Sequence, residues 1–265
     1  MPYPLSATKL QDYHRCPKSY YFKYERGLKN KAFFVPPALG KALHAALAKI
    51  YWDWHYLDPL PKSSWINECW ESVSSELKNE LQDSGLEILD NYYRQFILPL
   101  ISLRKPLAVE GKIQAILNFC NIDFKISGRY DRLDWFEDGV ELIDYKSTKT
   151  MPVFAEDEID LQIGLYYLAL EQKYQRSLKQ MSLLYLQLGE AIVFEATPEH
   201  KQQVEKTVGE LAVQLRSDSE WEPNPGEQCA RCTYTRYCPA VTDPPDPLPD
   251  QAKEQNHLQL SLLLD

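Results

Sequence analysis

The spacing of apolar residues changes near residue 106 from a helical period to a strand period. Before that point apolar residues recur every three or four positions, which is typical of helices that bury one face. After it, short runs rich in β-branched and aromatic residues alternate with turn residues and predict strands. We expect helices over residues 7–15, 17–25, 39–54, 63–81, 86–103, 157–174 and 198–216, and strands over 107–117, 118–127, 130–136, 140–145, 181–188 and 191–195. This order predicts an α/β domain with a mixed sheet.

Residues 126–145 form the predicted hairpin that carries most of the ionisable candidates. Asp138-Gly139 is a tight-turn signal between two apolar strands. If these two residues form the loop, Asp131 lies across from Lys146. Side chains in a strand alternate between its faces, so Asp131, Asp144 and Lys146 then share one face of the sheet.

Two carboxylates and a lysine on one face indicate metal chemistry. Adjacent carboxylates repel, so one of them tends to hold a proton. A divalent cation removes that conflict, and oxygen ligands suit magnesium or manganese. A lysine beside the ion can orient or deprotonate a water and stabilise charge developing on a phosphate. A charged hairpin face that is simply solvated fits the same residues, so the pattern by itself leaves both interpretations open.

The sequence around these residues resembles the core of the PD-(D/E)xK nuclease superfamily. Gly128-Arg129-Tyr130-Asp131 followed by Asp144-Tyr145-Lys146-Ser147 is similar to the "G-x-x-D … D-Y-K-[ST]" pattern of the RecB-like exonuclease branch, which includes the nuclease domains of RecB and AddB and the CRISPR-associated RecB-like exonucleases. The resemblance implies a restriction-endonuclease-like core and a metal-dependent DNA exonuclease that acts in repair, recombination or CRISPR-type processing. It implies Mg²⁺ or Mn²⁺ held by His44, Asp131, Asp144 and the Tyr145 backbone carbonyl, with Lys146, Asp131 and Asp144 catalytic.

Four residues outside the hairpin gain meaning from the resemblance. A lone helical histidine such as His44 usually packs, but the family carries a ligand in a similar "G-x-x-x-H" helix. Glu110 matches a glutamate at the start of the family's sheet, and a salt-bridge role fits it equally well. Gln162 and Tyr166 lie four apart on one expected helix face. They are similar to a "Q-x-x-x-Y" motif that contacts the site and the DNA strand, although an ordinary amphipathic helix would look the same.

The cysteines divide into one group and two isolated residues. The group comprises Cys16, Cys229, Cys232 and Cys238, and the isolated residues are Cys69 and Cys120, which we expect to be ordinary buried thiols. Disulfides are rare in cytoplasmic proteins, so the group predicts thiolate ligation of zinc or of an iron–sulfur cluster, and the spacing does not decide between them. The split pattern resembles the [4Fe–4S] staple of AddB and the CRISPR-associated exonucleases, which would tie the first helices to the C-terminal loop.

Composition limits the location and the partners of the chain. The 265 residues contain no apolar run long enough to cross a membrane, and we expect a cytoplasmic protein. The net charge of −9 argues against a broad, nonspecific nucleic-acid surface. Basic residues nevertheless crowd the first thirty or so positions, which predicts either a local DNA-guiding surface or a solvated helix face. They are Lys9, His14, Arg15, Lys18, Lys23, Arg26, Lys29 and Lys31.

We expect one nuclease domain over residues 1–242, with a helical section (1–106), a catalytic core (107–216) and a cluster loop (217–242) closing onto Cys16. Four prolines within Asp243–Pro249 predict a disordered linker and tail over 243–265. The sequence Gln259-Leu260-Ser261-Leu262-Leu263 resembles peptides that bind bacterial sliding clamps. Helicase motifs are lacking, so any motor would be a separate protein, and the substrate is expected to be DNA that is single-stranded or has single-stranded ends. The alternative is a zinc- or cluster-stapled DNA-binding module without catalysis.

Overall fold

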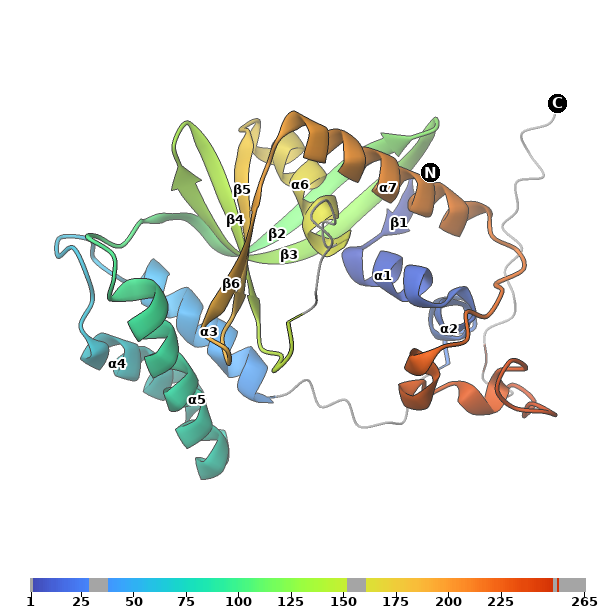
Figure 1. Cartoon of the computed structure of the whole chain (residues 1–265), viewed down its shortest axis with the longest axis horizontal. Helices are drawn as coiled ribbons and strands as arrows, with labels where there is room; N and C mark the ends of the chain where they lie inside the picture. Colours follow the sequence, from blue (N-terminus) through green and yellow to red (C-terminus); the bar gives the residue numbers. More distant parts are fainter. Residues whose placement is uncertain (1, 29–37, 152–160, 250–251, 253–265) are drawn as a thin grey trace.

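The computed structural model describes residues 2–28, 38–151, 161–249 and 252 (Figure 1). The helices are α1 (Ala7–Arg15), α2 (Pro17–Tyr20), α3 (Ala38–Trp52), α4 (Ser63–Ser74), α5 (Asn79–Tyr92), α6 (Leu161–Tyr174) and α7 (Pro198–Ser217). The strands are β1 (Tyr3–Leu5), β2 (Pro106–Phe119), β3 (Ile122–Phe136), β4 (Gly139–Lys146), β5 (Leu178–Tyr185) and β6 (Glu190–Glu195). π-Helical turns continue α2 and α5 over Tyr21–Glu25 and Tyr93–Ile97. None of the described helices has the length and apolar character needed to span a membrane.

The strands form one mixed sheet that divides beside β3. The order is β1-β3-β4-β5-β6, and β2 runs antiparallel along β3 on its other edge. The remaining edge of β3 is shared, because β1 pairs with Phe124–Ile126 in parallel and β4 pairs with Arg132–Phe136 in antiparallel fashion. The part of β3 between these two pairings, residues 127–131, therefore lies where the sheet opens.

Helices cover the two faces of the sheet and create two cores. Helices α1, α6 and α7 pack against one face, and α3, α4 and α5 form a second layer around the other core (Figure 1). Strand β4 serves both cores, because Leu142 belongs to the first and Ile143 and Tyr145 belong to the second. A strand covered on both faces reads as an unbroken apolar run, which explains why its alternation is weak in the sequence.

Several expected elements are confirmed and others are corrected. The helix over 7–15 forms as expected, and the Ser6 side chain accepts a hydrogen bond from the Lys9 N–H at its start. The expected helix over 63–81 ends at Ser74, and the next begins at Asn79 rather than near residue 86. Residues 122–127 of the strand expected over 118–127 are continuous with the strand expected over 130–136 and form β3, because Gly128 lies inside it, whereas residues 118 and 119 end β2. The short β1 is a strand that the pattern did not predict.

The β3–β4 register differs from the expected one by two residues. Phe136 pairs with Gly139, so the loop is Glu137-Asp138 and not Asp138-Gly139, and Glu137 takes the positive φ of 51°. Gly139 is needed for another reason: a Cβ there would lie 2.2 Å from the Ser177 carbonyl oxygen. A shift of two preserves the face of every side chain, and Asp131 comes level with Asp144 instead of Lys146.

The first part of the expected disordered linker packs on the protein. The Asp246 N–H donates to the Arg236 carbonyl at 2.7 Å, and Leu248 packs against a small core formed by Phe22, Leu28 and Tyr234. Residues 246 and 248 thus contact other parts of the chain, and the disordered linker and tail expected over 243–265 stay a prediction. The clamp-like sequence Gln259–Leu263 lies outside the described residues.

Candidate active site

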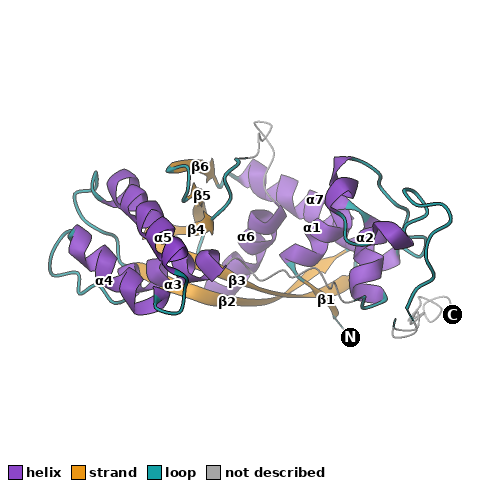
Figure 2. Cartoon of the chain, turned by 90° about the horizontal axis from the view of Figure 1, so that it is seen from below, coloured by secondary structure: helices purple, strands orange, loops and turns teal. Residues whose placement is uncertain are grey.

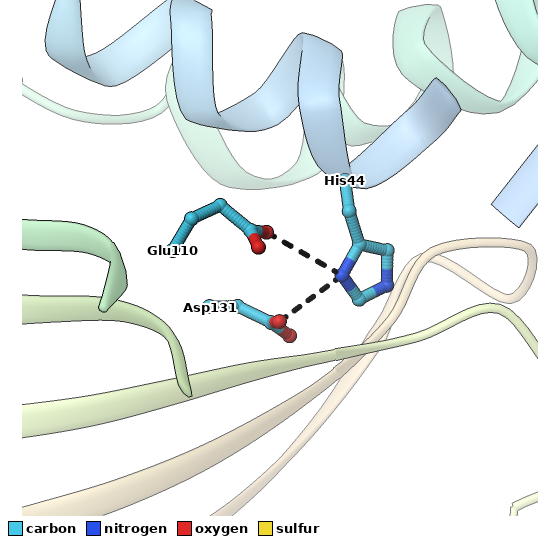
Figure 3. A group of neighbouring side chains, drawn as sticks. All are labelled: His44, Glu110 and Asp131. Carbon is cyan, nitrogen blue, oxygen red and sulfur yellow. Dashed lines mark hydrogen bonds and ion pairs between the residues drawn. The ribbon is translucent and has the colours of Figure 1, made fainter. Parts of the chain in front are cut away.

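Three side chains from separate elements converge where the sheet divides (Figure 3). His44 comes from α3, Glu110 from β2 and Asp131 from β3. His44 Nδ1 lies 3.0 Å from Asp131 Oδ1 and 3.9 Å from Glu110 Oε1, and one ligand atom from each residue lies within 4.8 Å of the other two. The side chains are 28%, 36% and 14% exposed for His44, Glu110 and Asp131, so an ion could reach them from solvent. Two carboxylates with an imidazole form a suitable donor set for a divalent cation.

Backbone geometry brings Glu110 and Asp131 together. Val109 pairs with Arg132 and Gly111 with Tyr130, so Glu110 and Asp131 occupy the intervening, mutually opposed positions. Glu110 has a φ of 47°, a left-handed conformation that is uncommon for a non-glycine residue and often marks a functional site. The sequence alone does not place Glu110 opposite Asp131, because that position depends on the β2–β3 register.

Asp144, Lys146 and Gln162 form a second polar group beside the first. Lys146 Nζ lies 2.8 Å from Asp144 Oδ2, and Gln162 Nε2 donates to Asp144 Oδ1 at 2.9 Å. Lys146 Nζ also donates to Gln162 Oε1 at 3.3 Å. The two groups are joined by the backbone, because the Tyr145 N–H donates to Asp131 Oδ2 at 2.6 Å. The structure thus brings His44 and Asp131 together as expected but groups them with Glu110, while both carboxylate oxygens of Asp144 contact Lys146 or Gln162.

Tyr166 of α6 packs against β3 next to the site. Its ring packs against the backbone of Gly128, where an added Cβ would lie 2.7 Å from Tyr166 Cε1. Tyr166 is only 6% exposed. Burial raises the pKa of Tyr166, while hydrogen bonds with the Arg129 backbone and the Gln162 side chain act in the opposite direction. Gly128 in the motif is therefore explained by close packing of α6 against β3.

The pKa values of His44 and Glu110 are shifted because the ionisable side chains of this group lie close together. Burial lowers the pKa of His44, but the hydrogen bond and charge of Asp131, with the charges of Glu110 and Asp144, raise it overall. Desolvation and the charge of Asp131 raise the pKa of Glu110, while His44 and Arg129 act to lower it. The acidic groups repel each other in the absence of a cation, which is the expected property of a metal site.

The four grouped cysteines meet although 213 positions separate Cys16 from Cys229. Cys16, Cys229, Cys232 and Cys238 line one pocket together with Phe22, Pro223, Pro225 and Tyr234. The Gly226 N–H donates to Cys229 Sγ at 3.5 Å. Cys69 and Cys120 lie elsewhere: Cys69 is buried as expected, whereas Cys120 is exposed, because it lies in the β2–β3 turn.

Comparison with known proteins places the fold and the family. A solved structure named "Putative exonuclease", from Eubacterium rectale, aligns with a TM-score of 0.51 at 12% identity, over 92% of this chain and 90% of that one. The structure of SSO0001 aligns with a TM-score of 0.47 at 17% identity, over 90% of this chain and 87% of that one. At 12% identity, the first likeness shows a shared fold. A family model for the PD-(D/E)XK nuclease superfamily matches residues 4–239, a span that includes both polar groups and all four grouped cysteines. The chain therefore belongs to the PD-(D/E)XK nuclease superfamily.

Proposed function

We propose that this nuclease-superfamily chain is a metal-dependent DNA exonuclease of the RecB-like branch. The observation that carries the proposal is the convergence of the His44–Glu110–Asp131 group with the Asp144–Lys146–Gln162 group where β3 and β4 separate. The first group supplies donor atoms for a cation, and the second supplies the Lys146 amine. The two groups are joined through Tyr145, whose backbone N–H donates a hydrogen bond to Asp131. A non-catalytic DNA-binding module has no need for this arrangement.

The donor set fits Mg²⁺ or Mn²⁺. We propose His44, Glu110 and Asp131 as ligands, with Asp144 and the Tyr145 carbonyl as further members of the shell. A bound ion would lower the pKa of a coordinated water and neutralise the scissile phosphate. Lys146 is the proposed group that orients the attacking water, or deprotonates it as the neutral amine, because its side chain is 21% exposed and contacts Asp144 and Gln162. Gln162, with Tyr166 packed behind it, is proposed to position the DNA strand.

A [4Fe–4S] cluster is the proposed occupant of the cysteine pocket. A single zinc ion would also take four thiolates. The split cysteine pattern resembles the [4Fe–4S] staple of the RecB-like branch and favours the cluster, and the hydrogen bond from the Gly226 N–H to Cys229 Sγ suits a cluster-bound sulfur. We propose that Cys16, Cys229, Cys232 and Cys238 hold it and that residues 217–242 thereby close onto the N-terminal helices.

Partners are proposed from the sequence. The substrate would be DNA with single-stranded character, and a separate helicase would supply it during repair, recombination or CRISPR-type processing. The Gln259–Leu263 sequence would bind a bacterial sliding clamp, raising the local concentration of nuclease at DNA. Titration of a labelled peptide over residues 255–265 against a clamp tests this partner, with a Gln259→Ala, Leu262→Ala peptide as control. Equal or absent binding of the two peptides would remove the clamp from the proposal and leave the nuclease untouched.

The central test is a nuclease assay with strands labelled at either end, which also determines polarity. We expect degradation with Mg²⁺ or Mn²⁺ and none with a chelator. Lys146→Ala should reduce the rate by about 10²–10⁴-fold, the range contributed by a positioned proton-transfer group, while the protein stays folded. Lys149→Ala, an exposed lysine on the same chain segment, should cut like the parent. A Lys146→Ala variant that cuts as fast as the parent would refute the proposed role.

A further inference from the structure

The long β2–β3 hairpin has one buried face and one exposed face. The buried face, with Ile113, Phe124 and Ile126, packs under α1, α6 and α7. Figure 2 shows these helices on one side of the hairpin, with the opposite side turned away from them. The alternation between buried and exposed positions runs from residue 112 to residue 129. We call the exposed side the outer face, and it consists of Lys112, Gln114, Ile116, Asn118, Asp123, Lys125, Ser127 and Arg129.

The outer face carries positive charge next to the metal-binding group. Lys112 and Arg129 are direct cross-strand partners, and each lies two residues from a member of that group, Glu110 or Asp131. Like charges placed directly opposite each other destabilise a sheet. Within the described part of the chain, Lys112, Lys125 and Arg129 form no ion pair that would offset this repulsion.

Three further contacts involve the charged groups of this face or its edge. The acid at the far end of the face, Asp123, accepts a hydrogen bond from Asn118 at 2.7 Å. Lys173 Nζ donates to the Lys112 carbonyl at 2.6 Å and adds a further cation at the edge of β2. The charge of Arg129 also reaches Glu110, where it acts to lower the carboxyl pKa. The outer face thus carries three cations and one acid, Asp123, and its two paired cations lie at the end beside the candidate metal centre.

We propose that the outer face binds the phosphate backbone of single-stranded DNA and leads it to the metal centre, an inference that rests on the proposed nuclease function. Same-face residues of a strand are about 6.7 Å apart, twice the rise of about 3.3–3.4 Å per residue, which is close to the separation of successive phosphates in an extended nucleic-acid strand. Two β-strands present a strip about 5 Å wide between backbones, which suits one DNA strand better than a duplex. Ile116, 52% exposed opposite Lys125, offers an apolar surface for a sugar or base.

The test measures binding without cleavage. A fluorescein-labelled oligothymidylate is titrated in a chelator at several salt concentrations against the parent and a Lys112→Gln, Lys125→Gln variant. Single-stranded binding releases about 0.7 counterions per neutralised phosphate, so the loss of two contacts should reduce the log–log salt slope by about 1.4, with a fall in affinity on the order of tenfold at low salt. The matched control is Lys78→Gln, Lys206→Gln, which removes the same charge from exposed positions on other elements.

Each outcome decides the inference. Unchanged affinity and slope in the Lys112, Lys125 variant, or an equal loss in the control pair, would overturn it, and a loss seen only with blunt duplex would overturn the single-strand assignment. Hydrolysis of a small aryl phosphodiester with Mn²⁺ separates the two proposals, because such an ester reaches the metal centre without the outer face. A parent that cleaves neither the ester nor DNA would refute the nuclease, while the binding result would still decide the outer face.

Discussion

Asp131 joins three elements through one carboxylate. Its Oδ1 contacts His44 of α3, and its Oδ2 accepts the Tyr145 N–H of β4 at 2.6 Å. Glu110 has a looser position, 3.9 Å from His44 and 36% exposed. Substitutions of the two carboxylates should therefore have different effects, since Asp131 combines a structural contact with its proposed role as a metal ligand.

Glu110→Gln should weaken metal binding more than it disturbs the fold. We expect the half-saturating Mn²⁺ concentration for DNA cleavage to rise about tenfold or more, with much of the rate recovered at high metal. The measurement is cleavage rate against Mn²⁺ concentration, with the exposed Glu137→Gln as control. An unchanged metal requirement would show that Glu110 is not a ligand. Asp131→Asn should not be rescued by metal.

Gly128→Ala tests close packing at a single residue. The new Cβ would lie 2.7 Å from the Tyr166 ring, so the ring or β3 must move. We expect a loss of about 1–3 kcal/mol in unfolding free energy, typical of overpacking, with reduced cleavage. Gly128→Ala combined with Tyr166→Ala should be less destabilised than the sum of the single changes. Simple additivity in urea unfolding would contradict the contact.

At the level of elements, the β3–β4 hairpin rests on a buried charge network. Arg132 Nε lies 3.0 Å from Asp134 Oδ1, and its Nη1 donates to the Tyr145 hydroxyl at 2.8 Å. Its guanidinium also lies 3.7 Å from the Tyr51 ring centroid. Arg132 and Asp134 are 6% and 1% exposed, so neither charge can be left alone without a large desolvation cost.

Arg132→Met should destabilise the protein by about 3–5 kcal/mol, because Asp134 would remain buried and unpaired. The double variant Arg132→Met, Asp134→Leu should recover much of that loss, since both charges are removed. Urea denaturation of the parent, both single variants and the double variant gives the coupling. A single variant as stable as the parent would contradict this account of the hairpin.

The sequence predicted the elements that local patterns determine. The helix expected over 7–15 forms as α1, and alternation correctly put Asp131, Asp144 and Lys146 on one face of the sheet even though the expected register was wrong by two. What local patterns do not contain is contact between distant segments. The local pattern indicated a break between strands at Gly128, because it does not reveal the contact with Tyr166, 38 residues away. It indicated a turn at Gly139 for the same reason, since the contact with Ser177 is equally distant in sequence. Glu110 required both the β2–β3 register and its left-handed backbone.

At the scale of the whole molecule, contacts join the first helices, α1 and α2, to the segment that follows α7. Trp221 stacks on Tyr20 with ring centroids 5.7 Å apart, and the Tyr13 hydroxyl donates to Asp218 at 2.7 Å. The Asn224 side chain donates to the Arg15 carbonyl at 3.2 Å, next to Cys16. Protein contacts therefore bring the cysteines near one another, and the proposed cluster would add a bonded link to this closure.

Cys16→Ser should bleach a brown, anaerobically prepared protein and lower its stability without abolishing the fold. The aromatic and hydrogen-bonded contacts remain, so the loss should be partial. A cost of about 2 kcal/mol would lower the thermal midpoint by roughly 4–8 °C in a chain of this size.

Cys120→Ser is the control, because it changes an exposed thiol in the β2–β3 turn and should keep both colour and midpoint. Absorbance spectra and iron and sulfide analysis follow the cluster, and calorimetry follows the midpoint. A colourless parent containing one zinc would replace the cluster with zinc, and a bleached Cys16→Ser variant with the parent's midpoint would show that the cluster does not staple the molecule.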